Sequence, residues 1–120
     1  MDKYNKFQIN NFDDMEWDVI RKGVQRKVFS GRDATVAYNH GARGHEVKPH
    51  SHVYEQYAII LEGEGIFSIG GQDYPVKKGS WMVIPSNVEH YLTVTSDEPC
   101  VSLDVFTPRR LEIMAEEKSC

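Results

Sequence analysis

The sequence predicts a single all-β domain, and three observations lead to this prediction. The chain has 120 residues, a length that suits one domain with its own core. Short runs of β-branched and aromatic residues recur along it, separated by Gly, Pro, Asn and Asp about every eight to twelve residues. No apolar stripe with helical spacing is sustained before the C-terminal region. These features favour a β-sandwich, or a barrel closed enough to protect its edges.

Eight runs are expected to form strands. In chain order they are Val24–Ser30, Ala34–His40, Tyr57–Gly63, Gly65–Gly70, Gln72–Val76, Ser80–Pro85, His90–Ser96 and Cys100–Phe106. Gly70 and Gly71 separate two of these runs and predict a tight hairpin turn, because primed turns need positive φ.

The chain is divided into three parts. Residues 21–107 are expected to form the barrel, and residues 108–120 a tail in which "RRLEIMAEEKSC" favours a short C-terminal helix. Residues 1–20 form an arm that begins with the polar, aperiodic stretch "MDKYNKFQINNFDDM". This arm either pairs with a partner chain or is a frayed terminus.

Composition and charge exclude several classes of function. The formal net charge is −4, and the 14 basic residues are interspersed with 18 acidic ones. Apart from Arg109 and Arg110 the sequence has no basic stripe, so a nucleic-acid partner is not expected. The N-terminus lacks the apolar core of a signal peptide, and the longest aliphatic run, Ala58–Leu61, is too short to span a bilayer. Cys100 and Cys120 have no metal-binding spacing and are expected as free thiols. We therefore expect a cytoplasmic protein without a membrane partner.

The spacing of the histidines indicates a metal site. The candidate ligands are His50, His52, Gln56 and His90. Residues two and four apart on an extended strand share a face, and a barrel can return His90 to the same interior. Three imidazoles and an amide oxygen suit Mn, Fe, Co, Ni or Zn better than Ca or Mg. The alternative is a chance arrangement of surface histidines. His40 and His45, in "NHGARGHEV", are expected to be loop residues.

A carboxylate is expected inside the barrel mouth. In "SLDVFTPRR", Asp104 alternates with apolar residues, so one set of side chains faces the interior. A buried charge needs a partner. Beside a metal-bound substrate Asp104 can act as a general base, whereas the plainer alternative is a structural ion pair with a Lys or Arg. Arg109 or Arg110, just beyond the strand, can grip a substrate carboxylate, and the register does not choose between them.

Two stretches resemble the motifs of the cupin family. The first is Gly44–Gly63, "GHEVKPHSHVYEQYAIILEG", with a Gly, the H-x-H pair, an amide and a second Gly. The second is Gly79–Val94, "GSWMVIPSNVEHYLTV", in which Asn87 replaces the usual Gly and Val94 the usual Asn. Asn87 can also adopt the left-handed conformation that this turn needs. The resemblance implies a double-stranded β-helix, or jelly-roll barrel, with one divalent transition metal in its mouth. It also implies a homodimer in which N-terminal strands exchange.

Gln56 stands where most metal-binding cupins have Glu. A carboxylate would bring the charge of a divalent site to about +1, whereas a neutral amide leaves it near +2. The higher charge disfavours oxidation of the metal and makes it a stronger Lewis acid toward a substrate oxygen. Gln56 therefore favours acid–base chemistry over redox chemistry, unless the site is degenerate and the amide is only tolerated.

The pattern H-x-H, Gln, distant His and D-x-F-x-x-x-R resembles the KdgF-type cupins of pectin degradation, which convert 4,5-unsaturated uronates into their linear ketone form. The resemblance implies that the ligand set named above holds the metal. It implies acid–base work for Asp104, a substrate-shaping role for Phe106, and binding of the uronate carboxylate by Arg110.

Other classes share these motifs and stay open. One alternative is a cupin dioxygenase, which Gln56 argues against. A second is an enzyme resembling the cupin polyketide cyclases, and a third is a small-ligand-binding cupin without catalysis. The first expectation is a metal-dependent, non-oxidative isomerisation or ring opening of a small polyoxygenated acid.

Overall fold

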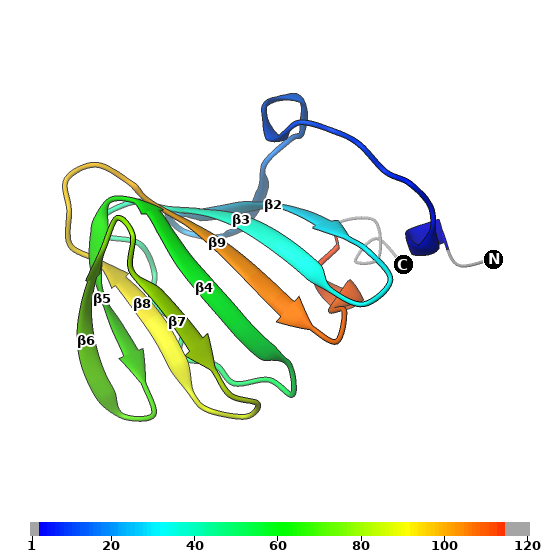
Figure 1. Ribbon diagram of the computed structural model, residues 1–120. Coiled ribbons are helices and arrows are strands. Elements are labelled where there is room, and N and C mark those ends of the chain that lie inside the picture. The colour runs from blue at the N-terminus through cyan, green and yellow to red at the C-terminus, as the bar shows by residue number, and fades with distance from the viewer. Residues whose placement is uncertain (1–2, 115–120) are drawn as a thin grey trace.

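The computed structural model describes residues 3–114 and confirms the all-β class (Figure 1). Within these residues the chain forms nine strands. They are β1 (Asp18–Arg21), β2 (Val24–Ser30), β3 (Thr35–Gly41), β4 (Glu55–Glu62), β5 (Glu64–Ile69), β6 (Gln72–Lys77), β7 (Trp81–Ile84), β8 (His90–Val94) and β9 (Cys100–Thr107). One sheet has the strand order β1-β2-β3-β9-β4-β7, and the other has the order β6-β5-β8. All pairs are antiparallel.

Each of the eight predicted runs overlaps one of these strands, and β1 is the strand that sequence reasoning missed. β1 has only four residues and pairs with β2 through an irregular step between Val19 and Arg21. Such a short strand has too few alternations to be read from its own sequence. β1 also crosses the expected junction between arm and barrel at residues 20 and 21, and the three-part division itself stays a prediction.

Two predicted turn features are confirmed. Gly70 and Gly71 both have positive φ, 59° and 84°, and connect β5 to β6 as a hairpin. Asn87 has a φ of 67°, the left-handed conformation expected where the motif usually has Gly. The turn before His90 therefore keeps its shape without Gly.

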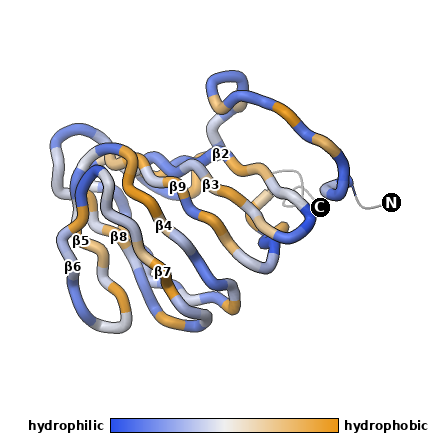
Figure 2. Tube along the Cα trace, viewed as in Figure 1, coloured by the Kyte–Doolittle hydropathy of each residue, from blue (hydrophilic) through white to orange (hydrophobic). Residues whose placement is uncertain are grey.

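The core lies between the two sheets. Along β4 the burial alternates, with Ala58 and Ile60 each 1% exposed. They pack with Phe67 of β5, Ile84 of β7 and Val94 of β8. Figure 2 shows hydrophobic positions recurring along strands of both sheets, as well as in the N-terminal segment. Each fully buried aliphatic or aromatic side chain contributes about 1.5–3 kcal/mol, and this core fixes the strands that carry the site.

The N-terminal segment runs outside the sandwich beside β2 (Figure 1). Phe12 lies in a 3-10 turn, Phe12–Asp14, and its ring stacks on Tyr38 of β3 with centroids 4.5 Å apart. Lys27 Nζ donates a hydrogen bond of 2.6 Å to the carbonyl oxygen of Phe12. These contacts hold this part of the arm against the outer face of its own chain, while Phe7 remains 89% exposed.

The tail closes one end of the sandwich. In the part of the chain that the structure describes, the expected C-terminal helix is reduced to a 3-10 turn, Leu111–Ile113. The rest of the expected helix falls at 115–120, outside the described residues. Ile113 packs against Ala37 and Phe106 in a second apolar cluster. None of the helical segments described is long and apolar enough to cross a membrane.

Candidate metal centre

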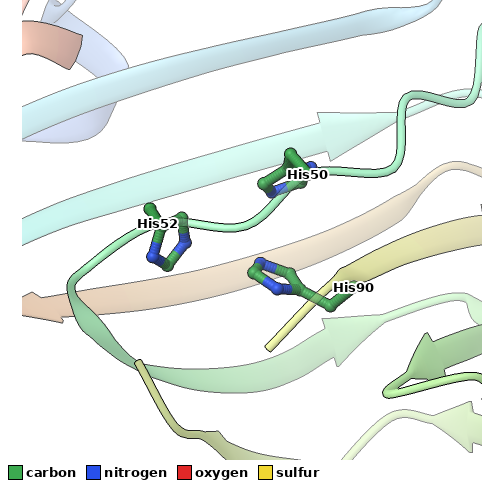
Figure 3. A group of neighbouring side chains, drawn as sticks. All are labelled: His50, His52 and His90. Carbon is green, nitrogen blue, oxygen red and sulfur yellow. The ribbon is translucent and has the colours of Figure 1, made fainter. Parts of the chain in front are cut away.

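Three histidines from distant parts of the chain meet between the sheets (Figure 3). His50 and His52 lie in the segment before β4, and His90 begins β8. One candidate ligand nitrogen of each histidine lies within 4.8 Å of the others. The three histidines are therefore positioned to bind a metal, as predicted.

The local backbone differs from the expectation of one continuous strand. His50 forms only an isolated bridge with His90, with backbone N–H···O distances of 3.2 and 2.9 Å. The chain then bends at Val53 and Tyr54 before β4 begins. The strand therefore does not continue from His52 to Gln56, which was the condition for these two side chains to share one strand face. The bend itself brings their side chains together, and the bridge places His50 beside His90.

Hydrogen bonds fix the orientation of each imidazole. Nδ1 of His50 lies 2.9 Å from the carbonyl oxygen of Lys48, and Nδ1 of His52 lies 3.0 Å from that of Tyr54. Nδ1 of His90 lies 2.8 Å from the carbonyl oxygen of Val88. A carbonyl oxygen only accepts, so each neutral ring carries its proton on Nδ1 and leaves the Nε2 lone pair free. This is the arrangement that metal-binding histidines show.

His90 provides the test of whether the residues fit a metal. Its side chain is 2% exposed, and its Nε2 atom is buried without a hydrogen-bond partner. Burial lowers the pKa of His90 to about 4, and the neighbouring His50 and His52 also lower it. The hydrogen bond to the carbonyl oxygen of Val88 acts in the opposite direction and raises it. Burial also lowers the pKa of His50. Neutral rings and a buried, unpaired lone pair fit a bound cation.

Gln56 connects the histidines to the predicted acid–base residue. It is 4% exposed, and its Oε1 atom lies 3.1 Å from Nε2 of His52. Its side chain also hydrogen-bonds the Asp104 carboxylate. The amide N–H donates to the carboxylate, so Oε1 is the atom that faces the lone pair of His52. Two acceptors that face each other at this distance suit a shared cation.

Asp104 lies on β9 and lines the same cavity, about 310 Å³ in volume, as His50 and His90. Besides Gln56, it accepts a hydrogen bond of 2.5 Å from Nδ2 of Asn39 on β3. Burial raises the pKa of Asp104 to about 7, and the hydrogen bond from Gln56 and the positive charge of Arg26 oppose this rise. The carboxyl group is held by amides, which differs from the ion pair offered as the structural alternative.

The choice between the two arginines is visible in the structure. Arg110 lines the cavity, and its guanidinium lies 4.9 Å from the ring centroid of Phe106. Its Nε atom donates to Glu112 at 3.1 Å, and Glu112 also accepts from the hydroxyl of Tyr54 at 2.7 Å. Arg109 instead lies over the ring of Tyr4. Of these two arginines, Arg110 is the one that lines the cavity.

Two groups of site residues were missed. Asn39 and Arg26 line the cavity from β3 and β2, and Tyr54 and Glu112 support Arg110. Asn39 could not be found from its own run, because its role depends on β3 pairing with β9. Arg26 did leave a signal, since it alternates with Val24 and Val28 at positions that would otherwise be apolar. His40 and His45 also line the cavity. His45 lies in a loop as expected, whereas His40 lies in β3, so the expectation of a loop residue was wrong for His40.

Together the fold and the site define a β-sandwich with a three-histidine centre between its sheets. The cupin domain family matches residues 36–106, and the chain belongs to this family. The match covers the segment from β3 to β9, which includes all three histidines.

Individual relatives are more distant. Residues of this chain are 27% identical over 79 residues to the dimethylsulfoniopropionate lyase DddW of Ruegeria pomeroyi, covering 66% of this chain and 50% of that protein. They are 28% identical over 102 residues to the acireductone dioxygenase of Bacillus thuringiensis, covering 66% and 60%. The chain thus spans 50–60% of the length of these relatives. The structure of KdgF from Halomonas sp. is 25% identical, covers 91% of this chain and 98% of that chain, and superposes with a TM-score of 0.78.

Proposed function

We propose that the protein is a metal-dependent enzyme that opens the ring of a 4,5-unsaturated uronate without oxidation, giving the linear ketone. The observation that carries this proposal is the position of Gln56 between His52 and Asp104. It places a neutral amide beside the metal position and a carboxylate next to it. The likeness to KdgF over 91% of the chain supports the same substrate class.

The proposed metal ligands are His50, His52, Gln56 and His90. A divalent ion held there, Ni, Zn, Mn, Fe or Co, would supply Lewis-acid polarisation of a substrate oxygen. The remaining chemistry is assigned to side chains of this chain.

Asp104 is the proposed acid–base residue. Its carboxylate accepts the proton of the anomeric hydroxyl while C1 becomes the aldehyde carbon, the bond between C1 and the ring oxygen breaks, and its electron pair passes to the ring oxygen to give an enolate at C5. Asp104 then returns the proton to C4, which forms the ketone. No electron is gained or lost, so no oxidant is required. A pKa near 7 suits a group that both accepts and donates a proton at neutral pH.

Arg110 and Phe106 are the proposed substrate-binding residues. Glu112 accepts from Nε of Arg110, which leaves the terminal guanidinium nitrogens for a carboxylate. The ring of Phe106 is 4% exposed and lies beneath the guanidinium, where it can bound the space for the sugar ring. Holding the carboxylate in this way would orient the anomeric carbon toward Asp104.

Proton NMR tests the proposed function directly. Metal-loaded protein is mixed with a 4,5-unsaturated galacturonate, beside a metal-stripped control. We expect faster loss of the C4 vinyl proton and growth of the linear ketone signals in the loaded sample only. If both samples match the spontaneous rate, the uronate assignment fails.

An oxygen-dependent reaction is the second candidate, because 66% of the chain matches an acireductone dioxygenase. Oxygen uptake during turnover, measured with an electrode, would favour this candidate over the isomerase. Binding of a small acid without any turnover would favour the non-catalytic alternative.

We also propose that the chain forms a homodimer through the outer face of the larger sheet. Tyr57 and Ile59 of β4 pair with Val83 and Trp81 of β7, and their side chains are 38–72% exposed. An exposed apolar patch of this kind is typical of an interface. Light scattering should give twice the chain mass, and Trp81→Lys should halve it; a monomeric wild type would refute this. Exchange of the arm and a cytoplasmic location stay predictions.

A further inference from the structure

The cavity that holds the metal centre is strongly cationic, although the chain as a whole is acidic. Its lining includes four basic side chains, Arg21, Arg26, Lys48 and Arg110, and among the described residues Asp104 is its one carboxylate. The chain carries a net charge of −4. A concave site lined by one sign of charge concentrates ligands of the opposite sign. The excess of positive charge exists before any metal is counted.

Arg26 is the member of this group that the proposed function does not use. It lies on the cavity side of β2 and pairs in register with Asn39 of β3, which donates to Asp104. Its Nε atom is buried without a hydrogen-bond partner. A guanidinium is always charged and donates in a fixed planar fork, so an unsatisfied buried Nε–H is costly.

Charged neighbours compensate Arg26 only in part, through the attraction of Asp18 and Asp104. Burial lowers its pKa, and the like charge of Arg110 lowers it more than the attraction of Asp18 raises it. Two guanidinium groups on β2 and after β9 therefore face one cavity at a cost to the folded chain. Such a cost is expected where the missing partner is a ligand.

We propose that Arg26 and Arg110 together bind one carboxylate of the substrate, with the Arg26 side chain turning so that its Nε–H, which is buried in this structure, donates to the carboxylate. This rests on the proposed function for the identity of the sugar, because it uses the same cavity. Arg26 thereby becomes a specificity-determining residue that selects an acidic sugar over its neutral counterpart. Two guanidinium groups give directed donors that a single point charge lacks.

Calorimetry with metal-loaded protein tests this. The probes are D-galacturonate, which lacks the double bond needed for the reaction, and neutral D-galactose. We expect Arg26→Met to weaken galacturonate binding at least about tenfold, the loss typical of a charge-assisted hydrogen bond. Galactose binding should not change. Arg32→Met is the matched control, because Arg32 is exposed beside Asp33 and its loss removes the same charge.

Two results would overturn the role of Arg26. One is a loss in Arg26→Met no greater than in Arg32→Met, and the other is an equal loss for galactose. A second measurement is made on the wild-type protein, so it does not depend on the stability of Arg26→Met. The Nε–H signal of Arg26 in ¹⁵N-labelled wild type, assigned by its absence from Arg26→Lys, should move when galacturonate or acetate is added. If neither carboxylate moves it, the proposal fails.

The same measurement separates this proposal from the proposed function. A shift with acetate, but no tighter binding of galacturonate and no turnover of unsaturated uronate, would keep Arg26 as an anion-binding residue and reject the uronate. Turnover of the uronate with an unmoved Arg26 signal would reject Arg26 alone.

Discussion

Replacing Gln56 with Glu should disturb the centre in two ways that can be measured separately. Gln56 is almost fully buried and donates to Asp104 while its oxygen faces His52. The Gln56→Glu change removes that donor and puts a second carboxyl group against the first. A lost hydrogen bond to a charged group costs about 2 to 3 kcal/mol. For a domain of this size the melting temperature should fall by roughly 10 °C in the metal-free protein.

The penalty should depend on pH with a defined sign. Two adjacent carboxyl groups in the folded chain hold a shared proton, so their pKa is raised above the unfolded value. The folded chain then binds more protons than the unfolded chain, and stability falls as the pH rises through the raised pKa. We therefore expect a larger loss at pH 8 than at pH 5, measured by urea unfolding. Gln72→Glu, on exposed β6, is the control and should show little change at either pH.

Turnover provides the second readout. The metal content of Gln56→Glu should be preserved, because a carboxylate is also a ligand, but the uronate reaction should slow at least about tenfold as the site charge falls from about +2 to +1. Equal turnover in Gln56→Glu and wild type, together with the same unfolding behaviour as Gln72→Glu, would refute the role assigned to the amide.

Three other predictions follow from the same structure. Asp104→Asn should reduce turnover by at least about a hundredfold with the metal content intact, and retained activity would remove Asp104 from the mechanism. Gly63→Ala should cost about 3 kcal/mol in urea unfolding, because φ is +82° and the new Cβ would lie 2.6 Å from Cα of Cys100; Gly71→Ala, with φ +84° and open space, should cost only about 1. In a Cys120→Ser background, Cys100 should react with iodoacetamide at pH 8 about a hundredfold more slowly than a free thiol, because burial raises its pKa to about 11; fast labelling would contradict this.

The strands were predictable because their information is local. The alternating burial along β4 and the Gly-Gly turn after β5 both follow from residues that are neighbours in the sequence. The short β1 was missed because its four residues show no clear alternation, and it is recognised as a strand only by its pairing with β2. Local pattern therefore gives most of the architecture, and strand order adds the remainder.

The candidate site divides in the same way. The three histidines that are positioned to bind a metal were found from motif spacing, although the local backbone around His52 is bent instead of extended. Asn39 became visible only when β3 was seen beside β9. Arg26 interrupts an apolar alternation in the sequence, but its place in the cavity also depends on β2 lying beside β3. Arg110 was separated from Arg109 by its side-chain contacts, since its guanidinium lies over Phe106 and that of Arg109 lies over Tyr4. The pairing of strands that are distant in the sequence decides which polar side chains share a cavity. This pairing cannot be deduced from local patterns in a single sequence.

The backbone bridge between His50 and His90 has a consequence for how the fold opens. His90 belongs to the smaller sheet, whereas His50 leads into the larger one, and their main chains are hydrogen-bonded to each other. A metal bound there would act as a clasp across the sandwich, closing a loop of about 40 residues in the manner of a cross-link. The two sheets could then separate only when the ion is lost, so both processes would have the same slow rate. In hydrogen exchange, the amides of His50 and His90 should gain protection together when metal is added.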